Sequence, residues 1–148
     1  MASLRQTFAQ NLREFRLLRG LSQEEVGEHV GSDRTSVSRI ERLAPNLTFE
    51  KVVLLSEALD VSPACMLTKD AARITDDIPA FQALVRRLGE TIRDQRTAKG
   101  LSQQQLGARA GLDRNHISRV ETDAARVALD TLEKIVVALG VSIDQIVL

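Results

Sequence analysis

Apolar residues recur at helical spacing at the start of each half of this 148-residue chain. Positions three and four apart lie on one face of a helix. This spacing predicts two long helices, one through Leu4, Phe8, Leu12 and Phe15 and the other through Phe81, Leu84, Leu88 and Ile92. Gly20 and Gly100 are expected to end them, because glycine readily takes the left-handed conformation that closes a helix. No segment shows the alternation of a strand, so the predicted fold class is all-α.

Capping residues divide the rest of each half into shorter helices. The predicted capping positions are Ser22, Asp33, Thr48 and Ser62 in the first half, and Ser102, Asp113, Ala128 and Ser142 in the second. Ser22 and Ser102 each stand three residues before Glu25 or Gln105, which is the spacing of a capping box. Asp33 and Asp113 are expected to open helices that run to about Arg42 and Thr122. Ala128 is a poor cap. Five helices are expected in each half.

The same pattern occurs twice, 80 residues apart. Gly20–Glu41 matches Gly100–Glu121, and no gap is needed to place residues 1–68 on residues 81–148. A repeat of about 70 residues is the size of a small autonomous domain. We therefore expect domains at 1–68 and 81–148, joined by a linker at 69–80. Asp76 and Asp77, with Pro79, look like the start of the helix that follows this linker.

The second and third helices of each half are joined by a short turn containing glycine, which is the helix-turn-helix arrangement. The expected apolar contacts are Val26, Val30, Val37 and Ile40, and in the second copy Leu106, Ala110, Ile117 and Val120. Gly27 and Gly107 interrupt the second helix of each copy, at a cost of about 1 kcal/mol of helix propensity against alanine. Close approach of two backbones is the expected compensation.

Composition narrows the class of protein. The single cysteine, Cys65, excludes an internal disulfide framework and a cysteine-rich zinc site, and it fits a reducing cytosol. No apolar run approaches the roughly 20 residues of a membrane span, and no secretory signal pattern opens the chain. No nucleophile, base and orienting acid recur at a recognisable spacing. We expect a soluble cytoplasmic protein without metal, cofactor or enzymatic activity.

The charge balance is neutral, whereas nucleic-acid-binding domains are usually basic. The two halves differ, however. Residues 1–68 carry 8 basic and 9 acidic side chains, residues 69–80 carry 2 and 3, and residues 81–148 carry 10 and 8. The position of these charges on the helices therefore matters more than their sum.

Both halves resemble the helix-turn-helix domain of phage repressors and Cro-type regulators, the XRE family. The resemblance covers nearly the whole chain outside the linker and is strongest over Gly20–Glu41 and Gly100–Glu121. It implies two tandem five-helix, lambda-repressor-like domains that bind double-stranded DNA and regulate transcription without catalysis. A bacterial origin is implied, in the nucleoid or encoded by a phage.

The resemblance also implies which residues contact DNA. In that family the third helix lies in the major groove, with its first residues on the base edges. Carried over by position, these residues are Arg34, Thr35, Ser36 and Arg39, and in the second half Arg114, Asn115, His116 and Arg119. Gln23 and Gln103 match phosphate contacts of the family. Arginine reads guanine, asparagine pairs with adenine, and the threonine methyl packs on that of thymine.

Two further expectations follow from the resemblance. Arg16 and Arg96 are expected to pair with Glu41 and Glu121 and to act structurally. The loop after the third helix, usually basic in the family, reads Leu-Ala-Pro-Asn at 43–46 and Asp-Ala-Ala-Arg at 123–126. Because this loop has few basic side chains, we expect modest affinity for DNA and only a weak dependence of that affinity on salt concentration.

The assembly and one alternative function stay open at this stage. The two halves of one chain can form an intramolecular pseudo-dimer, or two chains can pair as a homodimer. The alternative to a DNA-binding regulator is an antitoxin-like or accessory module, in which one half no longer binds DNA and contacts a protein partner instead.

Overall fold

The computed structural model describes residues 2–69 and 78–147. The chain divides into two compact units, Met1–Leu47 with Lys51–Ile78 and Thr48–Glu50 with Pro79–Leu148, which are described separately below. Every helix and turn named within the described ranges is α or 3-10, and no strand forms there. The all-α prediction is confirmed. The predicted domain limits stay predictions, because most of the expected linker lies outside the described residues.

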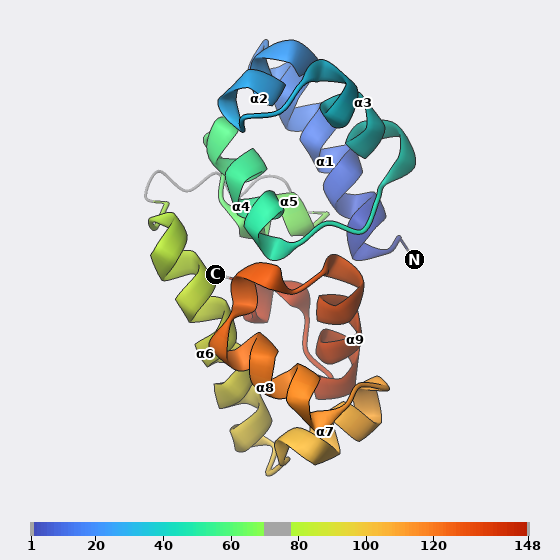
Figure 1. Cartoon of the computed structure of the whole chain (residues 1–148), viewed down its shortest axis with the longest axis vertical. Coiled ribbons are helices and arrows are strands. Elements are labelled where there is room, and N and C mark those ends of the chain that lie inside the picture. Colours follow the sequence, from blue (N-terminus) through green and yellow to red (C-terminus); the bar gives the residue numbers. More distant parts are fainter. Residues whose placement is uncertain (1, 70–77, 148) are drawn as a thin grey trace. The chain divides into compact units, whose positions relative to one another are not determined.

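The first unit contains five α-helices, labelled in Figure 1. They are α1 (Leu4–Leu18), α2 (Gln23–His29), α3 (Arg34–Leu43), α4 (Phe49–Ala58) and α5 (Pro63–Leu67). α1 packs against α3 and α5, and α2 packs against α3. The predicted apolar face of α1 is buried at Phe8, Leu12 and Phe15.

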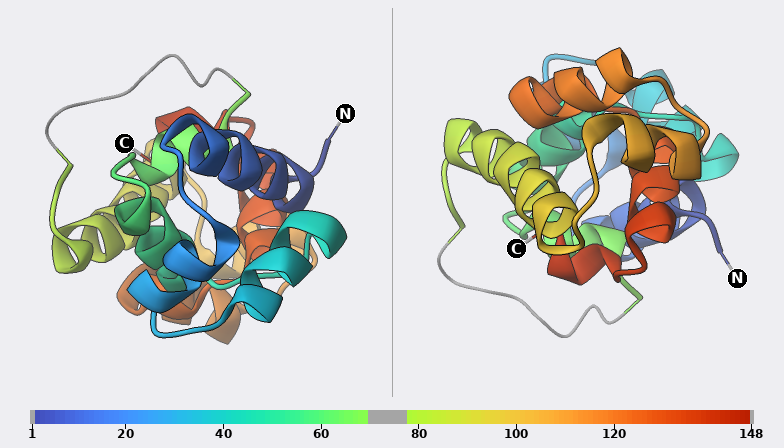
Figure 2. Two further views of the ribbon diagram at one scale, coloured as in Figure 1. Left: turned by 90° about the horizontal axis from the view of Figure 1, so that it is seen from above. Right: turned by 90° about the horizontal axis from the view of Figure 1, so that it is seen from below.

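The second unit repeats this order, with an added 3-10 turn after its third helix and a shorter last element. It contains α6 (Phe81–Ala98), α7 (Gln103–Ala110), α8 (Arg114–Thr122), the 3-10 turn η1 (Ala124–Arg126), α9 (Leu129–Leu139) and the 3-10 turn η2 (Ile143–Gln145). α6 packs against α8, and α7 packs against α8 and α9. The length of α6 can be followed from yellow-green to yellow in Figure 2. Leu88, Ile92, Leu106 and Ile117 are almost completely buried.

The predicted caps account for most helix starts. Ser22 and Ser102 form the expected capping boxes with Glu25 and Gln105, with bonds of 2.8–3.1 Å. The amide N–H groups of Ser36 and His116 donate to the carboxylates of Asp33 and Asp113 at 2.8 and 2.7 Å. α9 begins after Ala128 without a side-chain cap, as its sequence predicted. Its packing compensates for the missing bond.

The glycine prediction is also confirmed. A Cβ on Gly27 would lie 2.7 Å from the backbone of Asp33, and one on Gly107 would lie 2.5 Å from the carbonyl oxygen of Leu112. A third close approach escaped prediction: a Cβ on Gly89 would lie 2.4 Å from the carbonyl oxygen of Glu121. The matching residue of the first unit is Ala9, which is buried. The first helix therefore approaches the third more closely in the second unit.

Three details differ from the sequence prediction. The fifth element of the second unit is the 3-10 turn η2 and not an α-helix, and η1 was not predicted. In the first unit the amide of Asn11 donates to the carbonyl oxygens of Cys65, Met66 and Thr68 at 2.7–3.2 Å, which satisfies the end of α5. The matching position is Thr91, whose short side chain carries no amide to do this.

The start of α6 also differs. Ala80 is its N-cap and makes no side-chain cap hydrogen bond, so Pro79 precedes the cap. Asp76 and Asp77, which the sequence favoured as part of this start, lie outside the described residues.

The reciprocal exchange of Gly89 and Ala9 tests the different helix spacings. Gly89→Ala should destabilise the second unit by about 1–3 kcal/mol, because the new methyl group meets a backbone oxygen. Without that clash the same change would stabilise α6 by about 1 kcal/mol. Ala9→Gly should also destabilise, through lost packing and helix propensity. Calorimetric unfolding decides, and a stabilised Gly89→Ala variant would contradict the close approach.

Candidate nucleic-acid interface

Each unit holds its second and third helices as a rigid helix-turn-helix. Gly31 and Gly111 take positive φ angles of 68° and 72° in the turn. The amide of Ser32 then donates to the carbonyl of Gly27 at 2.7 Å, and that of Leu112 to Gly107 at 2.8 Å. These turns fix where α3 and α8 begin, and hence where their first side chains point.

The expected base-reading residues lie on the open surface of α3 and α8. Arg34, Thr35 and Arg39 are exposed, and so are Arg114, Asn115 and Arg119. Ser36 and His116 are half-buried at the first turn of the same helices. Within the described ranges no ion pair engages the four arginines. They are available to a ligand.

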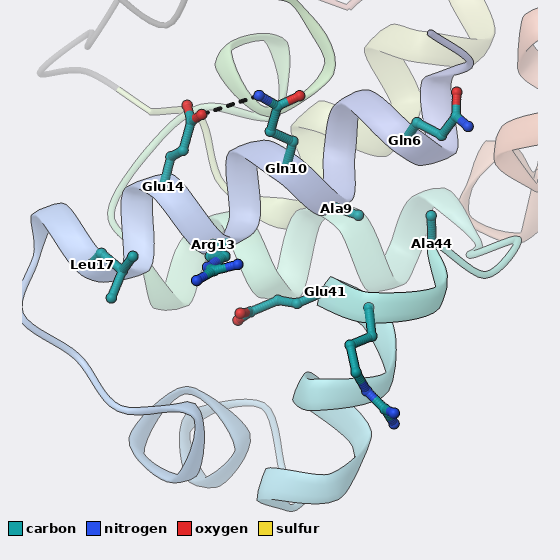
Figure 3. Close-up of a pocket in the computed structure, with 9 residues that line it drawn as sticks. Gln6, Ala9, Gln10, Arg13, Glu14, Leu17, Glu41 and Ala44 are labelled. Carbon is teal, nitrogen blue, oxygen red and sulfur yellow. Dashed lines mark hydrogen bonds between the residues drawn. The ribbon is translucent and has the colours of Figure 1, made fainter.

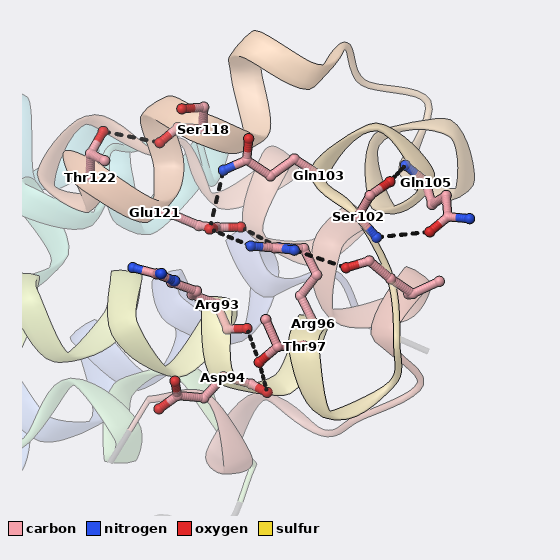
Figure 4. A network of polar contacts seen from close by, with 11 residues as sticks. Arg93, Asp94, Arg96, Thr97, Ser102, Gln103, Gln105, Ser118, Glu121 and Thr122 are labelled. Atoms are coloured by element: carbon pink, nitrogen blue, oxygen red, sulfur yellow. Dashed lines mark hydrogen bonds and ion pairs between the residues drawn. The ribbon is translucent and has the colours of Figure 1, made fainter.

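An arginine–glutamate pair lies behind α3 and behind α8, the third helix of each unit, which is expected to be the recognition helix. Nε and an Nη of Arg16 donate to the two carboxylate oxygens of Glu41 at 2.7 and 2.9 Å, and the other Nη donates to the carbonyl of Leu21 at 3.0 Å. Arg96 makes the same contacts to Glu121 and Leu101 at 2.8–3.1 Å, as Figure 4 shows. The side chains of each pair are 11% or less exposed. The predicted structural pairing is confirmed.

This pair connects three elements of each unit at one point. It joins the last turn of the first helix, the residue before the N-cap of the second helix and the end of the third helix. The hydrogen bond and charge of Glu41 raise the pKa of Arg16, against the lowering that burial causes. Arg16 is therefore held in its charged form and is not free to contact DNA.

Gln23 and Gln103 are attached to the same pairs. Their side-chain amides donate to Glu41 at 3.3 Å and to Glu121 at 3.4 Å. An amide nitrogen carries two hydrogens, so each glutamine retains one donor for a phosphate while the other fixes its direction. The sequence singled out both residues but not this anchoring.

The loop after the recognition helix differs between the units. In the first, Ala44 ends α3 in the left-handed conformation, with Leu43 64% exposed beside it. In the second, Asp123 lies 3.6 Å from Arg126, and both side chains are exposed. This pair partly neutralises the acid that the sequence placed near the expected phosphates.

The first unit also has a groove between α1 and the end of α3. It measures ≈ 610 Å³, and Figure 3 shows Arg13 and Leu17 on one wall and Glu41 on the other, with Gln10 bonded to Glu14 at 3.2 Å. The groove adjoins the last turn of α3, whereas Arg34 opens that helix. It is therefore not part of the surface that the base-reading residues form.

Two general findings limit the chemistry of the site. In residues 2–69 and 78–147, no group of three or more histidine, cysteine or acidic side chains could hold a metal ion. In the same part of the chain, no helix has both the length and the apolar composition that crossing a bilayer requires.

Comparison with known proteins places this geometry in a family. The helix-turn-helix family model matches the chain twice, at residues 12–64 and 92–146. The chain therefore belongs to the helix-turn-helix family of the XRE type, whose members are DNA-binding transcriptional regulators.

Two relatives each match about half of this chain. The control protein C.SmaI of Serratia marcescens is 31% identical over 70 residues, which cover 47% of this chain and 83% of that protein. A hypothetical transcription factor of Neisseria meningitidis serogroup B is 39% identical over 72 residues, which cover 49% of this chain and 68% of that protein. No solved structure matches the chain significantly.

Removal of either central arginine should destabilise its unit. Arg16→Ala and Arg96→Ala each leave a buried glutamate without its partner, at an expected cost of about 3–5 kcal/mol. Arg86→Ala is the matched control, because its pair with Glu90 is 3.8 Å long and exposed and should contribute little. Thermal unfolding measures the difference. Unchanged stability with lost DNA binding would show that Arg16 and Arg96 are DNA contacts after all.

Proposed function

We propose that this chain reads a specific DNA sequence by placing α3 and α8 in the major groove. The observation that carries the proposal is a set of three exposed side chains on each third helix, at its first, second and sixth positions, with the helix held from behind by the arginine–glutamate pair. The sets are Arg34, Thr35 and Arg39 on α3, and Arg114, Asn115 and Arg119 on α8. Rigid placement matters, because base readout requires a side chain to reach a donor or acceptor at a fixed position.

The proposed contacts follow from the chemistry of these side chains. The arginines donate two hydrogen bonds to guanine, and Asn115 pairs with adenine. Thr35 packs its methyl group on thymine. Ser36 and His116 lie one residue further along, and the remaining N–H of Gln23 or Gln103 binds a phosphate. The control-protein and transcription-factor names of the two relatives support a regulatory role in the bacterial cytoplasm.

One chain supplies two recognition helices, which is the number that one palindromic site requires. We propose that a single chain acts as a pseudo-dimer on such a site. The other arrangement is a homodimer that presents four helices. The mass of the protein–DNA complex in sedimentation distinguishes them, since one chain per site supports the pseudo-dimer and two chains contradict it.

Truncation of the first arginine of each recognition helix tests the proposed readers. Arg34→Ala and Arg114→Ala should each weaken specific binding by about 1–3 kcal/mol without loss of the fold, because each variant loses a base contact. Arg86→Ala removes an equal charge from an exposed site on α6 and should bind normally. Titration of DNA selected from a random pool measures the effect. If both variants bind with the affinity of the parent chain, the assignment of α3 and α8 as the base-reading helices is wrong.

The selected site should be an imperfect palindrome. Both units share arginines at the first and sixth positions of the recognition helix, so the half-sites should share their guanines. They differ at Thr35 and Asn115, so the adjacent position should carry adenine only under Asn115. Thr35→Asn should make the two half-sites more alike. An unchanged selected sequence in that variant would count against base readout at this position.

A further inference from the structure

The two helix-turn-helix units carry opposite charge on matching surfaces. Residues 22–42 hold five acidic and three basic side chains, whereas residues 102–122 hold two and three. One acid in each set is Glu41 or Glu121, which its buried arginine neutralises. The difference of three charges therefore belongs mainly to exposed positions of the second and third helices.

Three carboxylates on α2 account for most of this difference. Glu24, Glu25 and Glu28 are exposed, and their counterparts on α7 are Gln104, Gln105 and Ala108, also exposed. The next position along is His29 in α2 and Arg109 in α7. Thus the surface of α2 is acidic where that of α7 is neutral to basic.

One of these carboxylates, Glu24, lies beside the proposed phosphate and base contacts of the first unit. When the third helix enters the major groove, the second crosses the phosphate backbone. In the first unit, Glu24 lines a hollow of ≈ 440 Å³ together with Gln23 and Arg34, the proposed phosphate and base contacts, and with Ser22 and Arg16, whose charge is paired with Glu41. A phosphate that approaches Gln23 therefore meets a carboxylate in the same hollow, and like charges repel at this range.

We infer that the second unit supplies most of the affinity for DNA, and that the carboxylates of α2 make the first unit the weaker reader. The inference rests on the proposed function and deepens it. Phosphate neutralisation dominates affinity for DNA. A unit that repels phosphate can still discriminate between bases once its partner unit has bound, because the linked unit is then at high local concentration.

Charge exchange between the two copies tests the inference in the full chain. Glu24→Gln, Glu25→Gln and Glu28→Ala give α2 the residues of α7, and Gln105 already shows that glutamine closes the capping box. The reverse triple is Gln104→Glu, Gln105→Glu and Ala108→Glu. Gln104→Glu and Gln105→Glu place acids in the first turn of α7, where they favour folding, whereas Ala108→Glu lies near the C-terminal end of that helix and gains no such support. Circular dichroism checks both triples.

A third triple controls for net charge. The control also raises the net charge by three, as the α2 triple does. It consists of Glu14→Gln, Glu57→Gln and Glu90→Gln, at exposed positions on α1, α4 and α6. Fluorescence anisotropy of the selected DNA site, at low and at physiological salt, gives the affinities.

The α2 triple should bind about 10-fold more tightly at low salt and the α7 triple about 10-fold more weakly, with both effects reduced by salt. The control triple should change affinity less than 3-fold, roughly the effect of distant screened charges. Arg114→Ala should lose more affinity than Arg34→Ala.

Several outcomes overturn the inference. Equal gains in the α2 and control triples would show a whole-molecule charge effect, and a larger loss from Arg34→Ala would assign the affinity to the first unit. Unchanged affinity in both exchange triples would show that α2 and α7 lie away from the phosphates. In each of these cases base reading by α3 and α8 still holds, although the last outcome removes the proposed phosphate contacts of Gln23 and Gln103. A parent chain that selects no DNA sequence overturns the proposed function and this inference together.

Discussion

The buried arginine–glutamate pair determines the geometry on which the rest of each unit depends. Arg16 and Arg96 hold the first helix to the end of the third, and each also binds the carbonyl that precedes the second helix. The three elements therefore have one permitted arrangement. A buried charge without its partner is costly, so a unit that shifted its third helix would lose this pair and the anchoring of its glutamine. The same contact that fixes the fold also aims the recognition helix.

Local chemistry explains why so much of the helix-turn-helix could be predicted. Capping by Ser22 or Asp33, and closure by Gly31, involve residues within four positions of one another, so sequence spacing determines their geometry. The pair between Arg16 and Glu41 came from the family resemblance and not from spacing. Asn11 and Gly89 were missed because their partners are distant in the chain, and an asparagine or glycine inside a helix has no local signal for such a role. The exposed readers follow the family, and their contact with DNA stays a prediction.

A contact between residues distant in the chain also accompanies the difference in the last element of the two units. The two amide hydrogens of Asn11 are shared among three carbonyls around the end of α5, and α5 is a regular short helix. Thr91 stands at that position in the second unit, where the final turn is 3-10. The end of the fourth helix shows a related exchange. Gly140 takes the left-handed conformation in the second unit, whereas Asp60 takes it in the first and Arg19 donates to the carbonyls of Leu59 and Asp60.

Two tandem copies in one chain can differ in sequence, whereas the two domains of a symmetric dimer cannot. In a dimer of identical domains, a substitution on the second helix appears in both halves at once. In a tandem chain the two halves vary separately. The arginine–glutamate pair, the serine and aspartate caps of the second and third helices, and the first and sixth positions of the third helix are the same in both copies. Some of the differences lie on the exposed surfaces of α2 and α7 and at the second and third positions of the third helix. A change on those surfaces leaves the arginine–glutamate pair behind them intact.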